Sequence, residues 1–148
     1  MPRQPNPYPT ARELMRSLRA PDEAILRTYM ELVPGDPMAL PPSEVCVVIS
    51  SIARLHGKPL KVCTTYSGHS FCNVGKGMIM LSYTQGPNHR AGDMYVGLHE
   101  LAHWFGCVTE KAACSWSASL FLAAEKRRLG AAFPFVYSFS GHHLLPRA

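Results

Sequence analysis

Residues 97–106 place three ionisable side chains in an otherwise apolar segment, Gly-Leu-His-Glu-Leu-Ala-His-Trp-Phe-Gly. The spacing is His99-Glu100-x-x-His103, and the apolar pattern also extends upstream. This pattern predicts a buried helix over residues 93–105. A buried helix rarely carries two histidines and a glutamate unless a specific interaction offsets the cost of removing them from water. The segment therefore constrains both the fold and the chemistry of the chain.

Histidines four residues apart lie on one face of a helix, one turn apart. We expect His99 and His103 to offer two imidazole nitrogens to one Zn²⁺, with Glu100 beside them to hold a water molecule that the metal polarises. The simpler alternative is a helix whose histidines are only hydrogen-bonded in the core. A purely structural zinc ion would be expected to have four protein ligands rich in cysteine.

A catalytic zinc site needs a third protein ligand and an open coordination position. A third histidine six residues after His103 is excluded, because that position holds Thr109. Glu110 is the preferred candidate, since its helix must fold back against the first one. Glu125, later in the same helix, is the second candidate, although its basic neighbours favour a solvated helix end. Two residues of the C-terminal tail are more remote candidates: His142 and His143.

Length and composition are typical of a globular protein. The chain has 148 residues, of which 47% are hydrophobic, and we expect a proline-rich extended arm over residues 1–9 and a single domain over residues 10–148. The net charge of +5 permits contact with nucleic acid but does not require it. Five cysteines without a Cys-x-x-Cys pair favour free thiols. The N-terminus has no apolar signal core and no stretch approaches the length of a membrane span, so we expect a cytoplasmic protein without membrane contact.

The other secondary-structure elements are predicted from caps, glycine stops and hydrophobic periodicity. Helices are expected over residues 11–19, 21–32, 42–56 and 110–129, and short strands over residues 60–65 and 77–83. The first helix begins with a capping box, Thr10-Ala-Arg-Glu13. The tail from residue 131 receives no assignment. These elements predict an α+β fold, mostly helical, with a small antiparallel sheet.

The segment His99-Glu-Leu-Ala-His-Trp104 resembles the zincin-like metallopeptidase domain of ArdC-type antirestriction proteins. The strand from Gly77 is similar to the edge strand ahead of the motif in that domain and in ImmA/IrrE and SprT-like peptidases. Glu110-Lys-Ala-Ala113 resembles the segment that supplies the third ligand in the ImmA/IrrE group. The resemblance covers roughly residues 76–125. The link before Glu110 is shorter than in these families, and no ArdC-type DNA-binding domain is recognisable.

The motif and the resemblance together imply a small gluzincin, a hydrolase of minimal zincin-like fold with an HExxH active-site helix. One Zn²⁺ per chain would be held by His99, His103 and Glu110, with Glu100 as the general base for peptide-bond hydrolysis. The expected substrate is a protein or peptide, within a narrow range of partners. We expect strand 77–83 to line the cleft and pair with an extended peptide.

Two points stay open at this level. The alternative to a protease is a zincin-fold binding module of weak turnover that contacts DNA or a regulatory protein. A hydrogen-bond donor is also needed for the charge that develops in the transition state. The sequence does not choose among five candidates for that donor: His89, Arg90, Tyr137, His142 and His143. The oligomeric state is not indicated.

Overall fold

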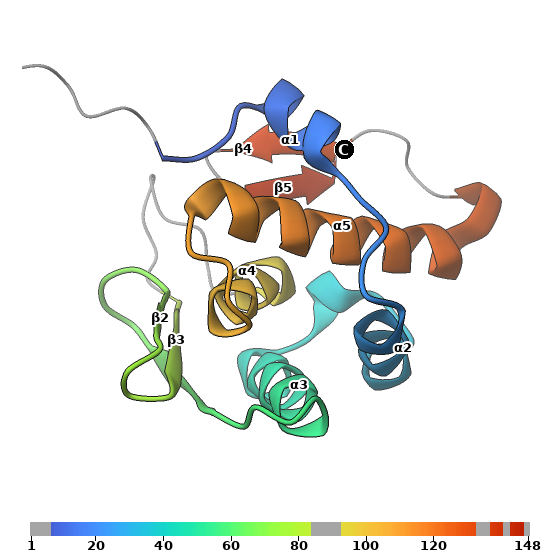
Figure 1. Ribbon diagram of the computed structural model, residues 1–148. Helices are drawn as coiled ribbons and strands as arrows, with labels where there is room; N and C mark the ends of the chain where they lie inside the picture. Colours follow the sequence, from blue (N-terminus) through green and yellow to red (C-terminus); the bar gives the residue numbers. More distant parts are fainter. Residues whose placement is uncertain (1–6, 84–92, 133–136, 141–142, 147–148) are drawn as a thin grey trace, which may run out of the picture.

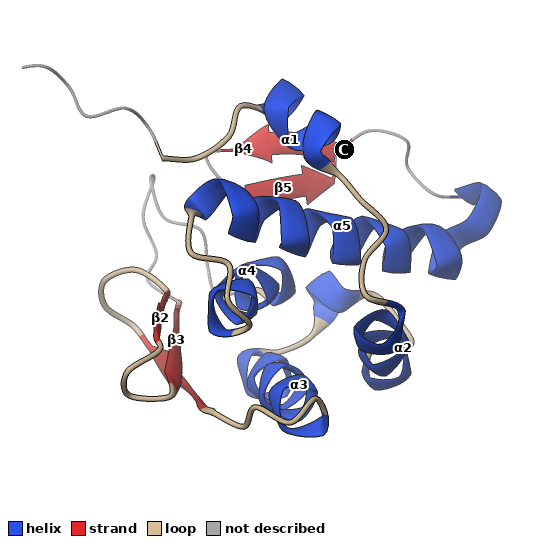
Figure 2. Ribbon diagram, in the orientation of Figure 1, coloured by secondary structure: helices blue, strands red, loops and turns tan. Residues whose placement is uncertain are grey.

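The computed structural model describes residues 7–83, 93–132, 137–140 and 143–146. The fold is α+β and mostly helical (Figures 1 and 2). The described α-helices are α1 (Ala11–Ser17), α2 (Glu23–Leu32), α3 (Pro42–Leu55), α4 (Met94–Trp104) and α5 (Glu110–Leu129). The strands are β1 (Lys61–Thr65), β2 (Phe71–Asn73), β3 (Met78–Ser82), β4 (Tyr137–Ser140) and β5 (His143–Pro146). Short 3₁₀ turns lie at Pro37–Ala39 and Gly130–Ala132. None of the described helices combines the length and apolar character needed to cross a membrane.

The helix caps explain where the predicted helices begin. The predicted capping box at Thr10 is confirmed, because its hydroxyl accepts from the Glu13 N–H and the Glu13 carboxylate accepts from the Thr10 N–H. Thr109 likewise caps α5 as predicted. The predicted start of the second helix is wrong. The Asp22 side chain accepts from the Ile25 N–H and becomes the cap, which leaves the preceding proline outside the helix.

The predicted antiparallel sheet is corrected to a mixed three-stranded sheet. The strand order is β1-β3-β2, with β1 parallel and β2 antiparallel to β3. The β2 strand was not predicted from the sequence, because three residues are too few to show a period-two pattern. A turn over residues 74–77 joins β2 to β3, and Gly77 in it has a φ of 61°. The β3 strand, expected to be at an edge, is therefore central.

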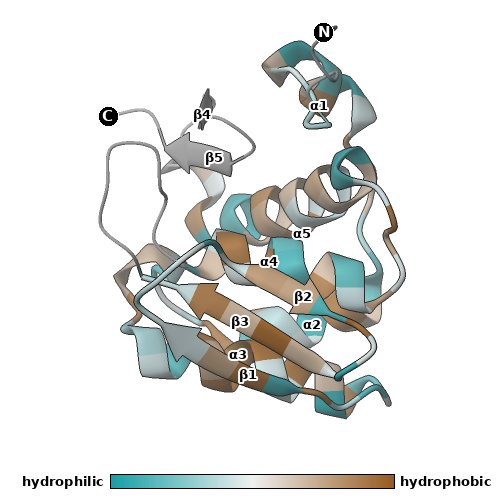
Figure 3. Ribbon diagram, turned by 90° about the vertical axis from the view of Figure 1, so that its left-hand side faces the viewer, coloured by the Kyte–Doolittle hydropathy of each residue, from teal (hydrophilic) through white to brown (hydrophobic). Residues whose placement is uncertain are grey.

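The hydrophobic core lies between the sheet and the helices. Ile79 and Leu81 of β3 are fully buried members of this core, and α3 and α4 cover one face of the sheet (Figure 3). The α4 helix contacts α3, α5 and the sheet, so it is enclosed on several sides (Figure 1). Its apolar residues confirm the predicted buried helix. A Cβ added at Gly97 would lie 2.9 Å from Ile49 Cγ1, which shows how closely α4 approaches α3.

The end of α4 is fixed to the segment before β1 by reciprocal contacts. The Trp104 indole N–H donates to the Lys58 carbonyl at 2.6 Å, and the Lys58 ammonium donates to the Trp104 carbonyl at 2.5 Å. The ammonium also lies 4.5 Å from the centroid of the indole ring, a cation–π contact. These bonds hold the last turn of α4, which carries His103, against the rest of the core.

We predict that Gly97→Val lowers the free energy of unfolding by about 1–3 kcal/mol, because the new side chain overpacks the contact between α3 and α4. Urea unfolding followed by circular dichroism measures this change. Gly35→Ala is the control, since a Cβ at Gly35 meets no atom within 4 Å. A Gly97→Val variant as stable as the wild type would show that this contact is not tightly packed.

Candidate metal centre

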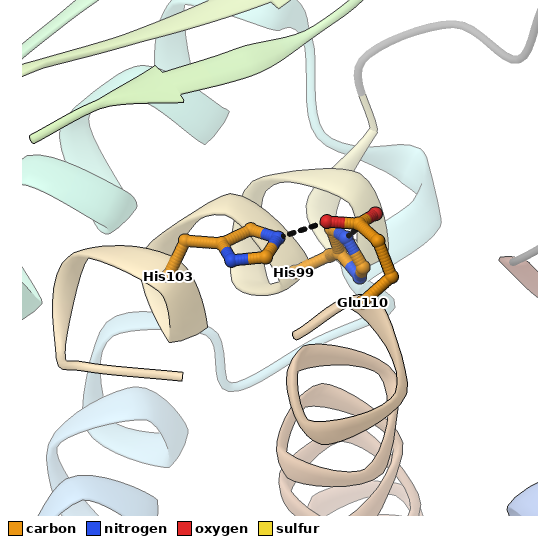
Figure 4. Close-up of side chains that lie close together, drawn as sticks. All are labelled: His99, His103 and Glu110. Carbon is orange, nitrogen blue, oxygen red and sulfur yellow. Dashed lines mark hydrogen bonds and ion pairs between the residues drawn. The ribbon is translucent and has the colours of Figure 1, made fainter. Parts of the chain in front are cut away.

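Three side chains of the predicted set converge at the junction of α4 and α5. His103 Nε2 lies 2.7 Å from Glu110 Oε1, and His99 Nε2 lies 3.2 Å from Glu110 Oε2. Figure 4 shows both imidazoles directed from α4 toward the carboxylate at the start of α5. One ligand atom from each residue lies within 4.8 Å of the others, and the group could hold a metal ion.

The reversal between the two helices places Glu110. Gly106 has a φ of 113°, a conformation that suits glycine. The Cys107 N–H then bonds to the Ala102 carbonyl at 2.9 Å, which closes α4 and turns the chain back. Of the small residues expected to allow close approach of the helices, Ala113 and Cys114 are buried, whereas their neighbour at position 112 is exposed.

Each histidine has a partner for its second ring nitrogen. His103 Nδ1 lies 2.7 Å from the Cys107 carbonyl oxygen. Because a carbonyl only accepts hydrogen bonds, Nδ1 carries a proton there, and Nε2 is the nitrogen left for a metal. His99 Nδ1 lies 3.6 Å from the Cys114 sulfur. Both rings are thus oriented with Nε2 toward Glu110, as metal-binding histidines require.

Hydrogen bonds within the group favour the charged forms of Glu110 and His103. Hydrogen bonds from His103 and then His99 hold the pKa of Glu110 well below its usual range. The bond to Glu110 is also the main cause that raises the pKa of His103. In the metal-free protein, hydrogen bonds join both imidazoles to the carboxylate. A divalent cation held between the same three groups would supply positive charge to the carboxylate, so the donor set fits a metal.

Glu100 is buried beside this group with only 7% of its surface exposed. Burial is the main cause that raises the pKa of its carboxyl, and Glu110 raises it further, while His99 and His103 oppose the shift. The raised pKa brings Glu100 closer to the range in which a carboxylate can both accept and release a proton near neutral pH.

The second candidate for the third ligand, Glu125, lies elsewhere on α5. It is 15 residues beyond Glu110, about 22 Å along a helix. Its basic neighbour Arg128 pairs with its carboxylate at 2.7 Å, but the expected solvation of Glu125 is wrong, because the side chain is buried. The Glu125 carboxylate therefore takes part in a different interaction.

Other predicted residues cannot be placed in the same way. His89, Arg90 and His142 fall outside the described residues. Tyr137 and His143 belong to β4 and β5, whose side chains are not among those described. The five cysteines are free thiols as expected, although only Cys114 is fully buried.

One contact at the centre was not predicted. The hydroxyl of Tyr8 donates a hydrogen bond to the Glu110 carboxylate. Burial and this bond raise the pKa of Tyr8 above its usual range, so the hydroxyl stays protonated as a donor. No local pattern signals this contact, because Tyr8 and Glu110 are far apart in the sequence.

No protein-family model matches the chain, and no curated protein or solved structure shows significant similarity to it. The assignment of a function therefore depends on the geometry and chemistry of the site.

We predict that Glu110→Gln lowers the pKa of His103 in the metal-free protein, because the neutral amide no longer favours the charged imidazole. A pH titration of the imidazole signals by NMR measures this shift. Glu31→Gln, on the exposed side of α2, is the charge-matched control. Equal His103 titration curves in all three proteins would show that Glu110 is not its partner in solution.

Proposed function

We propose that the protein is a zinc-dependent peptidase of the zincin type. The observation that carries this proposal is the convergence of His99 Nε2, His103 Nε2 and the Glu110 carboxylate, with Glu100 buried next to them. Two imidazoles and one carboxylate are a known ligand set of catalytic zinc, in which the fourth position is left for water or substrate. The resemblance of the α4 sequence to zincin-like peptidases supports the same assignment.

The chemistry of the donor set limits the choice of metal. When bound, Zn²⁺ lowers the pKa of a coordinated water and polarises the substrate carbonyl. Two histidines and a carboxylate also suit Fe²⁺, so metal analysis should quantify both ions. Glu100 favours the hydrolytic assignment, because hydrolysis needs a base beside the ligands.

Glu100 moves the proton in the proposed reaction. Its carboxylate accepts a proton from the attacking water and then donates it to the nitrogen of the leaving amine. The carbonyl carbon gains the water oxygen and the C–N bond breaks, so a peptide bond and a water give an acid and an amine. The burial that raises the Glu100 pKa assists the first step.

We reassign the strand that would pair with a substrate peptide from β3 to β2. The β3 strand is hydrogen-bonded on both sides, so it cannot pair with a peptide as expected from the sequence. The β2 strand is the better candidate. It lies over α4 (Figure 3), and no strand in the described part of the chain pairs with its outer edge. Its contacts with α4, the helix that carries Glu100, support this choice.

We predict that wild-type protein purified without a histidine tag contains about one zinc per chain and that His103→Ala loses it. Glu110→Ala should weaken zinc binding by more than the ~10–100-fold typical of residues outside the ligand set. Competition with a chromophoric chelator measures these affinities. Glu125→Ala is the comparison, and a larger loss of affinity in that variant would reassign the third ligand.

We predict that Glu100→Gln retains zinc but lowers peptide hydrolysis by about 10²–10⁴-fold, because the amide cannot accept the proton. A peptide library digested by the zinc-loaded protein and analysed by mass spectrometry provides the measurement, with Glu31→Gln as the control. If neither the wild type nor Glu100→Gln cleaves any peptide, and the variant keeps full biological function, the alternative of a zincin-fold binding module would be favoured.

A further inference from the structure

The N-terminal arm reaches the proposed metal centre through Tyr8. Its hydroxyl donates a hydrogen bond to the Glu110 carboxylate. Tyr8 is partly buried and the following residue, Pro9, is buried. This part of the arm is therefore packed against the protein.

A row of polar contacts along α5 determines where the arm lies. Three contacts tie α1 and the residues after it to α5: Lys111 Nζ to Glu13 Oε2 at 3.2 Å, the Ser115 hydroxyl to the Ser17 carbonyl at 2.9 Å, and the Arg19 N–H to the Ser119 hydroxyl at 3.0 Å. The α5 members are spaced by four residues, so they share one face of the helix. With α1 docked on that face, the chain before it is directed to Glu110, the first residue of α5.

The Tyr8 contact completes a pattern at the centre. The Cys107 carbonyl holds His103 and the Cys114 sulfur contacts His99, while Tyr8 contacts the third member of the group. The Glu110 side chain is also the most exposed of the three, at 27%, compared with 1% and 16% for the histidines. A glutamate has several rotatable bonds, so it benefits most from a partner that fixes its carboxylate.

We propose that Tyr8 is a positioning residue that orients Glu110 for metal binding, so that the N-terminal arm forms part of the metal centre. This inference rests on the proposed function, because it assigns a role toward the same ligands. The hydroxyl donates to one carboxylate oxygen and leaves the other lone pairs for the metal. The docking of α1 on α5 thereby contributes to metal affinity from outside the ligand set.

The test is the zinc affinity of Tyr8→Phe, which removes only the hydroxyl. We expect about 10–100-fold weaker zinc binding, the usual effect of removing an outer hydrogen-bond partner of a ligand. Competition with a chromophoric chelator gives the affinity, and thermal unfolding of the metal-free protein checks the fold. Tyr66→Phe, which alters a tyrosine that is 77% exposed, should bind zinc as the wild type does.

A double-mutant cycle distinguishes an effect of Tyr8 on zinc affinity that acts through Glu110 from an effect that is independent of Glu110. If Tyr8 acts through Glu110, Tyr8→Phe should cause no further loss of zinc affinity in the Glu110→Ala background. Wild-type affinity in Tyr8→Phe, or an equal loss in both backgrounds, would overturn the inference. Unchanged affinity with faster peptide hydrolysis would also overturn it and would assign Tyr8 a blocking role. Wild-type protein that binds zinc no better than His103→Ala would instead remove the metal centre itself.

Discussion

The cost of burying charge on α4 is the constraint on which the rest of the structure depends. His99 and Glu100 are 1% and 7% exposed, and isolated charges at such positions would be strongly unfavourable. Glu110 offsets this cost for the histidines, because its carboxylate contacts both imidazoles, whereas its negative charge disfavours ionisation of Glu100 and raises the pKa of that carboxyl. The turn at Gly106 and the cap at Thr109 bring the acid to that position. The surrounding fold thus serves to bring one carboxylate to two histidines.

The short link between α4 and α5 makes this pairing compact. A helix reversal over a few residues leaves little freedom in the position of Glu110 relative to His103, so local geometry determines where the proposed third ligand lies. The remaining freedom is in the rotation of the Glu110 side chain, which would be restricted by its hydrogen bond from Tyr8. A metal held in this way would depend on α1 as well as on α4 and α5, and its binding would stabilise all three elements together.

Local patterns predicted much of the site. The spacing of His99 and His103 predicted their shared face, and Thr109 followed by Glu110 predicted the start of α5. The parallel pairing of β1 with β3 was missed, because strand order depends on contacts between segments that are distant in sequence. The burial of Glu125 was missed because its neighbours in sequence are basic. In the fold it lies near Tyr29 and Met30 of α2, which are distant in sequence. The contact of Tyr8 had no local signal for the same reason.

The most direct measurement of the central claim is the X-ray absorption spectrum of the zinc-loaded protein at the zinc edge. Two imidazole nitrogens and a carboxylate predict a first shell of nitrogen and oxygen only, at about 2.0–2.2 Å, together with the outer-shell scattering of two histidine rings. A sulfur scatterer at about 2.3 Å would contradict the account, because it would mean that Cys107 or Cys114 binds the metal in place of Glu110.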